Sequence, residues 1–64
     1  MEASIDTTIG KWNLSAWEVT DGFMGIAWEP EKSLEEMNVM AVFRQPSADK
    51  AIEELKHEVD MYGN

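Results

Sequence analysis

His57 is the only histidine in the chain, and histidine is the side chain that most readily exchanges a proton near neutral pH. General acid–base or metal-binding chemistry would therefore involve His57, with Glu53, Glu54 and Asp60 close enough in sequence to orient it. These residues lie opposite the apolar stripe of the same segment, so we expect His57 to be a solvated surface side chain. One histidine and no cysteine are poor material for a metal site, and we expect no catalytic residue, metal or cofactor.

An acidic cluster surrounds the segment that follows the second expected strand, and it consists of Glu29, Glu31, Glu35 and Glu36. Paired carboxylates hydrolyse glycosides when a cleft holds the sugar between them, and a domain of this size scarcely encloses a cleft. The cluster is either a solvated acidic loop or a surface that engages something cationic. These four residues, with Trp12, are the candidate partner-binding residues.

Thirteen acidic and five basic residues give a formal net charge of −8. Such a charge repels the phosphate backbone of nucleic acids, so direct nucleic-acid binding is not expected. It either keeps a small protein soluble or attracts a basic partner. No apolar run approaches the roughly 18 residues of a membrane span. Residues 1–6 have neither the basic start nor the apolar run of a signal peptide, and we expect a cytoplasmic protein.

The segment Thr20-Asp21-Gly22-Phe23 predicts a two-residue β-hairpin turn of the primed type, with Gly22 at a positive φ. This turn pairs Val19 with Met24 and puts the alternating large residues of both strands on one side. We expect that side to be the core face and the C-terminal helix to pack on it. Its residues are Trp17, Val19, Met24, Ile26 and Trp28.

The remaining patterns predict an α+β fold with a three-stranded antiparallel sheet and one C-terminal helix on one face. Residues 1–10 are expected to form a flexible arm or an edge strand, and residues 11–64 a single β-β-β-α domain. Residues 30–38 fit either a single helical turn or an ordered loop. Ser47 caps the helix, and Gly63 is placed to end it. The helix buries a stripe at helical spacing, made of Ala48, Ala51, Ile52, Leu55, Val59 and Tyr62.

Trp12 is out of phase with Trp17 and Trp28 along the expected first strand. The strand therefore carries large apolar residues on both faces, with Trp12 and Leu14 opposite Trp17 and Val19. Exposed apolar patches mark association sites, and tryptophan is frequent among residues that dominate binding. Trp12 is thus either core, a dimer seam or a partner anchor, and we expect a homodimer.

The order of strand, Asp-Gly turn, strand, short strand and capped helix resembles the N-terminal domain of HicB-like antitoxins. The residues that carry the resemblance are Trp17-Glu18-Val19-Thr20-Asp21-Gly22-Phe23-Met24-Gly25-Ile26-Ala27-Trp28 and Pro46-Ser47-Ala48-Asp49-Lys50-Ala51-Ile52-Glu53-Glu54-Leu55. The resemblance implies a non-enzymatic domain that binds and neutralises a basic, RNA-directed toxin.

These observations favour a non-catalytic protein-binding module that engages a basic protein partner. One alternative is an acidic mimic of nucleic acid that inhibits a DNA- or RNA-binding protein, which requires carboxylates in a spaced double row on one surface. The other is a small ligand-binding protein or enzyme, which requires His57 to converge with polar groups in a pocket.

Overall fold

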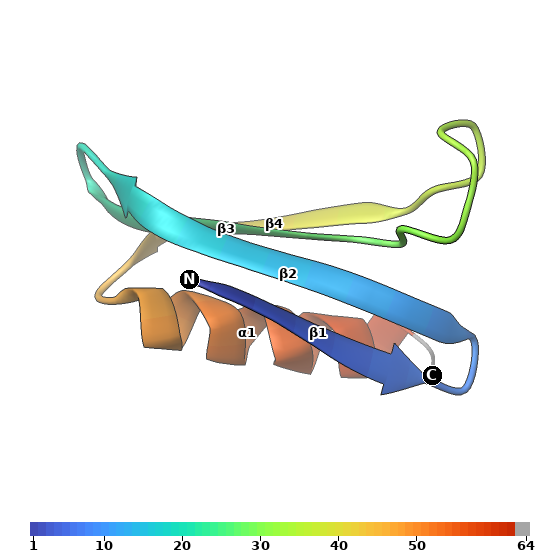
Figure 1. Cartoon of the computed structure of the whole chain (residues 1–64). Coiled ribbons are helices and arrows are strands. Elements are labelled where there is room, and N and C mark those ends of the chain that lie inside the picture. The colour runs from blue at the N-terminus through green and yellow to red at the C-terminus, as the bar shows by residue number, and fades with distance from the viewer. Residues whose placement is uncertain (63–64) are drawn as a thin grey trace.

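The computed structural model describes residues 1–62, which form a four-stranded antiparallel sheet with one helix on one face (Figure 1). The strands lie in the sheet in chain order. The elements are β1 (Glu2–Thr7), β2 (Gly10–Val19), β3 (Gly22–Trp28), β4 (Val39–Gln45) and α1 (Ala48–Tyr62). The α+β class is confirmed, but the expectation of three strands is wrong, because the sheet has four.

The additional strand is β1, formed by the segment expected to be a flexible arm or an edge strand. It pairs with β2 from Glu2↔Ser15 to Thr7↔Gly10. The N-terminal ammonium of Met1 extends this pairing by donating to the carbonyl oxygen of Ala16 at 2.7 Å. Backbone hydrogen bonds therefore hold a strand whose side chains carry only a weak alternating pattern.

The β2–β3 turn is shifted from the predicted register. Val19 pairs with Gly22 and Trp17 with Met24, so the loop residues are Thr20 and Asp21. Gly22 has the predicted positive φ, at +128°, but neither loop residue has a positive φ. The turn is therefore not of the primed type, which needs a positive φ within the loop. A shift of two residues leaves every side chain on its predicted face.

The helix packs on the face opposite to the one predicted. The buried sheet residues under α1 include Trp12, Leu14, Ala16 and Ala27, whereas Trp17 is 41% exposed on the other face. Gly25 explains the choice, because a Cβ at this position would lie 2.8 Å from Cδ1 of Leu55. Small residues let the helix approach the sheet closely, and larger ones would hold it away.

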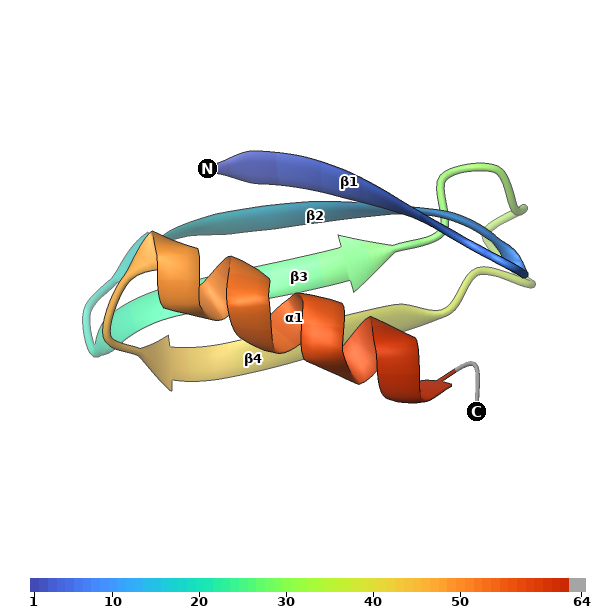
Figure 2. The same ribbon diagram turned by 90° about the horizontal axis from the view of Figure 1, so that it is seen from below.

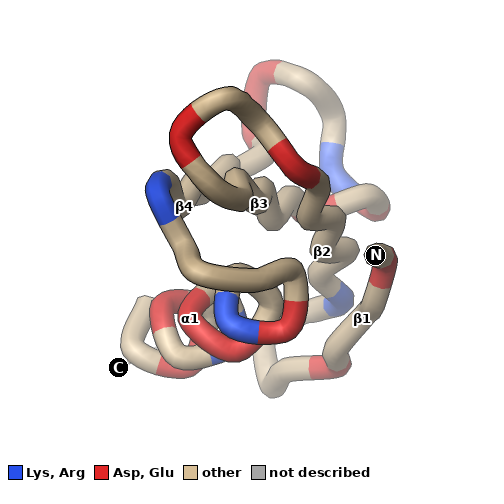
Figure 3. The backbone as a smooth tube through the Cα atoms, turned by 90° about the vertical axis from the view of Figure 1, so that its left-hand side faces the viewer, with Lys and Arg blue, Asp and Glu red and all other residues tan. Residues whose placement is uncertain are grey.

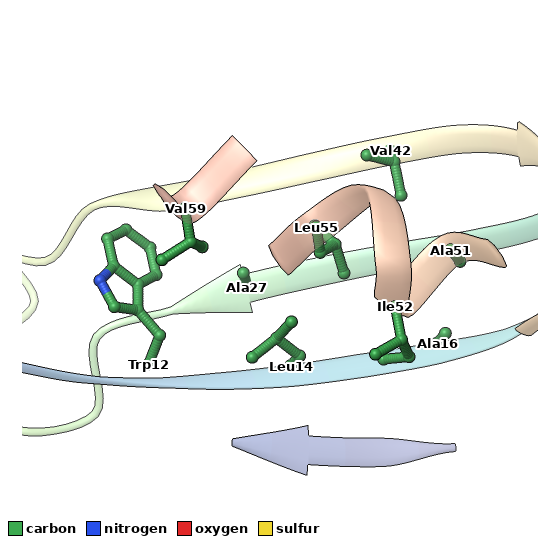
Figure 4. Packing of buried hydrophobic residues seen from close by; sticks show 9 residues of the cluster. All are labelled: Trp12, Leu14, Ala16, Ala27, Val42, Ala51, Ile52, Leu55 and Val59. Carbon is green, nitrogen blue, oxygen red and sulfur yellow. The ribbon is translucent and has the colours of Figure 1, made fainter. Parts of the chain in front are cut away.

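The helix forms as predicted and buries Ala51, Ile52, Leu55 and Val59, but Tyr62, expected in the buried stripe, is 49% exposed. Ser47 caps it, since the Lys50 backbone N–H donates to Ser47 Oγ at 3.1 Å. Seen from below, α1 runs obliquely under the sheet (Figure 2). Figure 4 shows Ile52 and Leu55 directed at the sheet and Val59 beside the indole of Trp12. Gly63, expected to end the helix, lies outside the described residues.

Leu55→Ala should lower the free energy of unfolding by about 2 to 5 kcal/mol, because Leu55 is fully buried between helix and sheet. The matched control is Leu34→Ala, since Leu34 is 88% exposed in the β3–β4 loop. Urea unfolding of both variants measures the difference. Equal losses in the two variants would contradict the packing described here.

Gly22→Val should destabilise the fold more than Gly10→Val. Both glycines have φ near +130°, but a Cβ at Gly22 would lie 2.8 Å from the Gln45 carbonyl oxygen, whereas the space around Gly10 is open. Strain at such a φ costs about 1 to 3 kcal/mol at either position, and only Gly22 adds the clash with β4. Thermal melts of the two variants test this, and identical losses would show that the close approach contributes nothing.

Candidate functional site

The feature of the structure most suited to binding is the sheet face that α1 leaves uncovered, which we call the open face. In Figure 1 it is the upper side of the sheet, away from the helix. Phe43 is 60% exposed, Val39 is 61% exposed and Trp17 is 41% exposed. Single exposed apolar residues are common on soluble proteins, but a contiguous patch marks a binding surface. The apolar residues of the open face are Trp17, Val19, Met24, Ile26, Trp28, Val39, Ala41 and Phe43. The same face continues through Ser15 and Asn13 of β2 to Glu2 and Ser4 of β1.

Register places these side chains next to one another. Ile26 pairs with Ala41 and Trp28 pairs with Val39, so β3 and β4 contribute neighbouring residues to the same face. Trp17 pairs with Met24 and extends the face onto β2. Directly paired residues have Cβ atoms about 5 Å apart, which makes the patch continuous across three strands.

A shallow groove of about 540 Å³ lies at the turn end of the open face. Its lining residues are Val19, Thr20, Asp21, Phe43 and Arg44. β4 contains a bulge here, because two steps along β3 from Phe23 to Gly25 match three along β4 from Gln45 to Val42. Arg44 sits in this bulge with φ at +56°, an uncommon backbone conformation for a residue other than glycine.

Trp12 is fully buried under α1 and does not lie on the open face. Its ring meets that of Tyr62 edge to face, with centroids 5.8 Å apart. A partner could not reach this indole without displacing the helix, so of the interpretations left open by the sequence, Trp12 is core. Trp17, expected in the core, is the tryptophan that is exposed instead.

Glu29 is also buried, with a side chain only 1% exposed, and it braces the loop between β3 and β4. Lys32 Nζ lies 2.6 Å from Glu29 Oε2, and the Asn38 backbone N–H and side-chain Nδ2 donate to Oε1 at 3.0 and 2.8 Å. These partners, Lys32 foremost, hold the pKa of Glu29 below its usual value although burial acts to raise it. The hydrogen bond to Glu29 likewise raises the pKa of Lys32. Glu29 is thus a structural carboxylate.

The other three acidic candidates, Glu31, Glu35 and Glu36, are exposed on the loop of residues 29–38. This loop contains no helix element, but the backbone N–H groups of Glu36 and Met37 both donate to the Ser33 carbonyl oxygen, at 3.0 and 2.8 Å. The segment is therefore an ordered loop that includes a single helix-like turn. Glu31 Oε1 accepts a hydrogen bond from the Lys11 backbone N–H at 3.4 Å, so the loop reaches the start of β2. In Figure 1 the loop rises on the side of the open face.

The acidic residues are spread over the molecule. Figure 3 shows Asp and Glu on the helix, on β1, around the β2–β3 turn and on the β3–β4 loop. Among residues 1–62 they thus lie on several separate elements, whereas a nucleic-acid mimic requires a spaced double row on one surface. Long-range attraction of a cation is therefore a property of the whole protein.

His57 is exposed on α1, as expected. Within the described part of the chain, no three His, Asp or Glu side chains gather as metal ligands do. None of the described helices has the length and apolar character needed to cross a membrane.

Comparisons with protein-family models, curated proteins and solved structures gave no match. The open face is thus identified from its physical properties. Sequence reasoning missed it as a site, because it assigned the larger apolar residues to the core. The small residues Ala16, Gly25 and Ala27 on the opposite face were the signal that could have located the helix.

Glu29→Gln should reduce the loss in free energy of unfolding that the parent protein shows between neutral and acidic pH. Because the pKa of Glu29 is lowered on folding, its carboxylate stabilises the fold above the unfolded-state pKa. That stabilisation is lost as the pH falls through the folded-state pKa. Urea unfolding at neutral pH and at about pH 3 measures the slope.

The matched control for this experiment is Glu35→Gln, since Glu35 is exposed on the same loop. It should keep the parent's loss of stability in acid. If stability falls with pH as steeply in Glu29→Gln as in the parent, the buried ion pair does not contribute to the loss of stability in acid.

Proposed function

We propose that this chain is a non-catalytic protein-binding module that engages a basic protein through the open face. The observation that carries the proposal is the continuous apolar surface across β2, β3 and β4, with Trp17 and Phe43 as its large exposed aromatic residues. Aromatic residues near the centre of an interface supply much of its binding energy. A sheet face of this kind suits a protein surface better than a small molecule, since the groove at its end is shallow and open.

The charge of the chain supports a cationic partner. The net charge is −8, and the exposed carboxylates Glu31, Glu35 and Glu36 stand on the loop that flanks the open face. An apolar centre with a charged rim is the usual organisation of a protein interface. The carboxylates attract the partner, and the aromatic residues hold it once docked. If the resemblance to HicB-like antitoxins reflects kinship, the partner is an RNA-directed toxin.

The competing functions have less support. A nucleic-acid mimic needs ordered rows of carboxylates, whereas these are scattered over the described residues. An enzyme that uses His57 needs other polar groups around it in a pocket, and His57 lies exposed on the outer side of α1.

Binding kinetics against the protein retained in a pull-down from the native host test this function. Phe43→Ala and Trp17→Ala should each hasten dissociation, because they remove apolar contact that forms only in the complex. Met61→Ala is the matched control, since Met61 is 60% exposed on α1, on the other side of the sheet. Dissociation unaffected by the two open-face variants would exclude this face as the contact surface.

Charge reversal should act on the association rate instead. Glu35→Lys with Glu36→Lys should slow association, and the effect should fade as salt rises. A control of equal charge change, Glu53→Lys with Glu58→Lys on α1, should slow association less, because the helix faces away from the open face. If association is indifferent to salt and to both pairs, the acidity serves solubility alone.

A further inference from the structure

We propose that in the purified protein the open face packs against the open face of a second copy, with the strands of the two sheets running antiparallel. This inference rests on the same surface as the proposed function, so a basic partner and a second copy would be alternative occupants. A second copy is always present at the concentration of the protein itself. Three features of the open face favour it as the occupant.

The first feature is area. Aromatic side chains each bring about 150 to 250 Å² into an interface, and Phe43 and Trp17 are 60% and 41% exposed. With Val39 and the half-buried residues of β3, the open face offers on the order of 500 Å² of apolar surface, at the upper end of what a typical monomer exposes. Two such faces, with the loops around them, reach the roughly 1,000 Å² of a small specific interface. A chain of 64 residues also gains much from a second layer, because it buries little surface alone.

The second feature is the placement of negative charge at the edge of the open face. On this face β2, β3 and β4 carry no acidic residue, and Glu2 and Asp6 lie on the edge strand β1, although the chain carries a net charge of −8. The carboxylates of α1 lie on the far side of the sheet from the open face (Figure 1). Packed sheets lie about 10 Å apart, and the two helices would stand outside both sheets. Their separation would exceed the screening length of about 8 Å at physiological salt, so the acidic helices would not oppose association.

The third feature is the polarity of the face along its strands. Arg44 lies at the turn end, in the groove with Val19, Asp21 and Phe43, and it forms no ion pair within residues 1–62. Arg44 and Asp21 therefore leave this end with little net charge. The acidic 29–38 loop lies at the opposite end of the strands. A two-fold axis along the strands would bring like ends together, Arg44 on Arg44 and loop on loop. A two-fold axis across the strands keeps the two acidic loops apart and places each beside the turn end of the other copy, where Arg44 offsets Asp21. This antiparallel arrangement is therefore the less repulsive one.

The oligomeric state of the full chain tests the inference. Light scattering across a range of concentrations should give twice the chain mass of 7.3 kDa. Phe43→Glu should give a monomer, since it buries a charge in the interface. Val39→Glu, at the other end of β4, should do the same. The matched control, Met61→Glu on α1, should remain a dimer, and circular dichroism should show all variants folded.

A parent protein that stays monomeric overturns the dimer and leaves the proposed function to be judged by partner kinetics. A dimer that survives both Phe43→Glu and Val39→Glu overturns the open face as its seam. If these variants dissociate the dimer, the inference is supported. If they also leave the binding of a basic partner unchanged, the open face is not the contact surface of the proposed function.

Charge exchange tests the antiparallel orientation. Arg44→Glu should raise the dimer dissociation constant by about tenfold, because the two-fold axis places the changed residue in the interface twice. Adding Glu35→Arg and Glu36→Arg to that variant should restore dimerisation. If Arg44→Glu has no effect, or the added changes weaken the dimer further, the antiparallel arrangement is wrong.

Discussion

The close approach of Leu55 to Gly25 is the contact on which the arrangement of this protein depends. A Cβ at Gly25 would stand 2.8 Å from Leu55 Cδ1 and 3.4 Å from Val42 Cγ2, so the glycine creates the space that Leu55 fills. Ala16 and Ala27 flank this position and are almost fully buried. Together these small residues allow α1 to pack close to the sheet. Dense packing of this kind selects the face with small side chains for the helix.

The exposure of the open face follows from that choice. One helix covers one face of a four-stranded sheet, so the large residues of the second face stay in contact with water. Burying them in an interface would add apolar contact to a chain that, at this length, buries little surface by itself. The surface that the fold leaves uncovered is therefore the one through which we propose that the protein associates, with a second copy or with a foreign protein.

The buried carboxylate of Glu29 connects the core with the acidic loop. It lies one residue beyond β3, and its bonds to Lys32 and Asn38 tie both ends of the 29–38 loop to the sheet. Glu31, Glu35 and Glu36 are consequently held at one end of the open face. Two members of one acidic cluster thus differ in environment: Glu29 is buried and supports the loop from inside, whereas Glu35 is exposed on its surface.

The sequence by itself determined the local features of this protein. The helical stripe of Ile52, Leu55 and Val59, the Ser47 cap and the alternation of β2 and β3 depend on near neighbours in the chain. The polar pattern of β1 was too weak to decide between arm and edge strand, and pairing with β2 decided it. The pairing register of the strands, and the choice of the sheet face that the helix covers, were also decided only by the tertiary structure. A slip of two residues preserves both faces, so the pattern correctly separated Trp17 from Trp12 while missing the pairing. Which face is buried depends on how closely the distant helix can approach, and this closeness is set by Gly25 and Leu55 in contact.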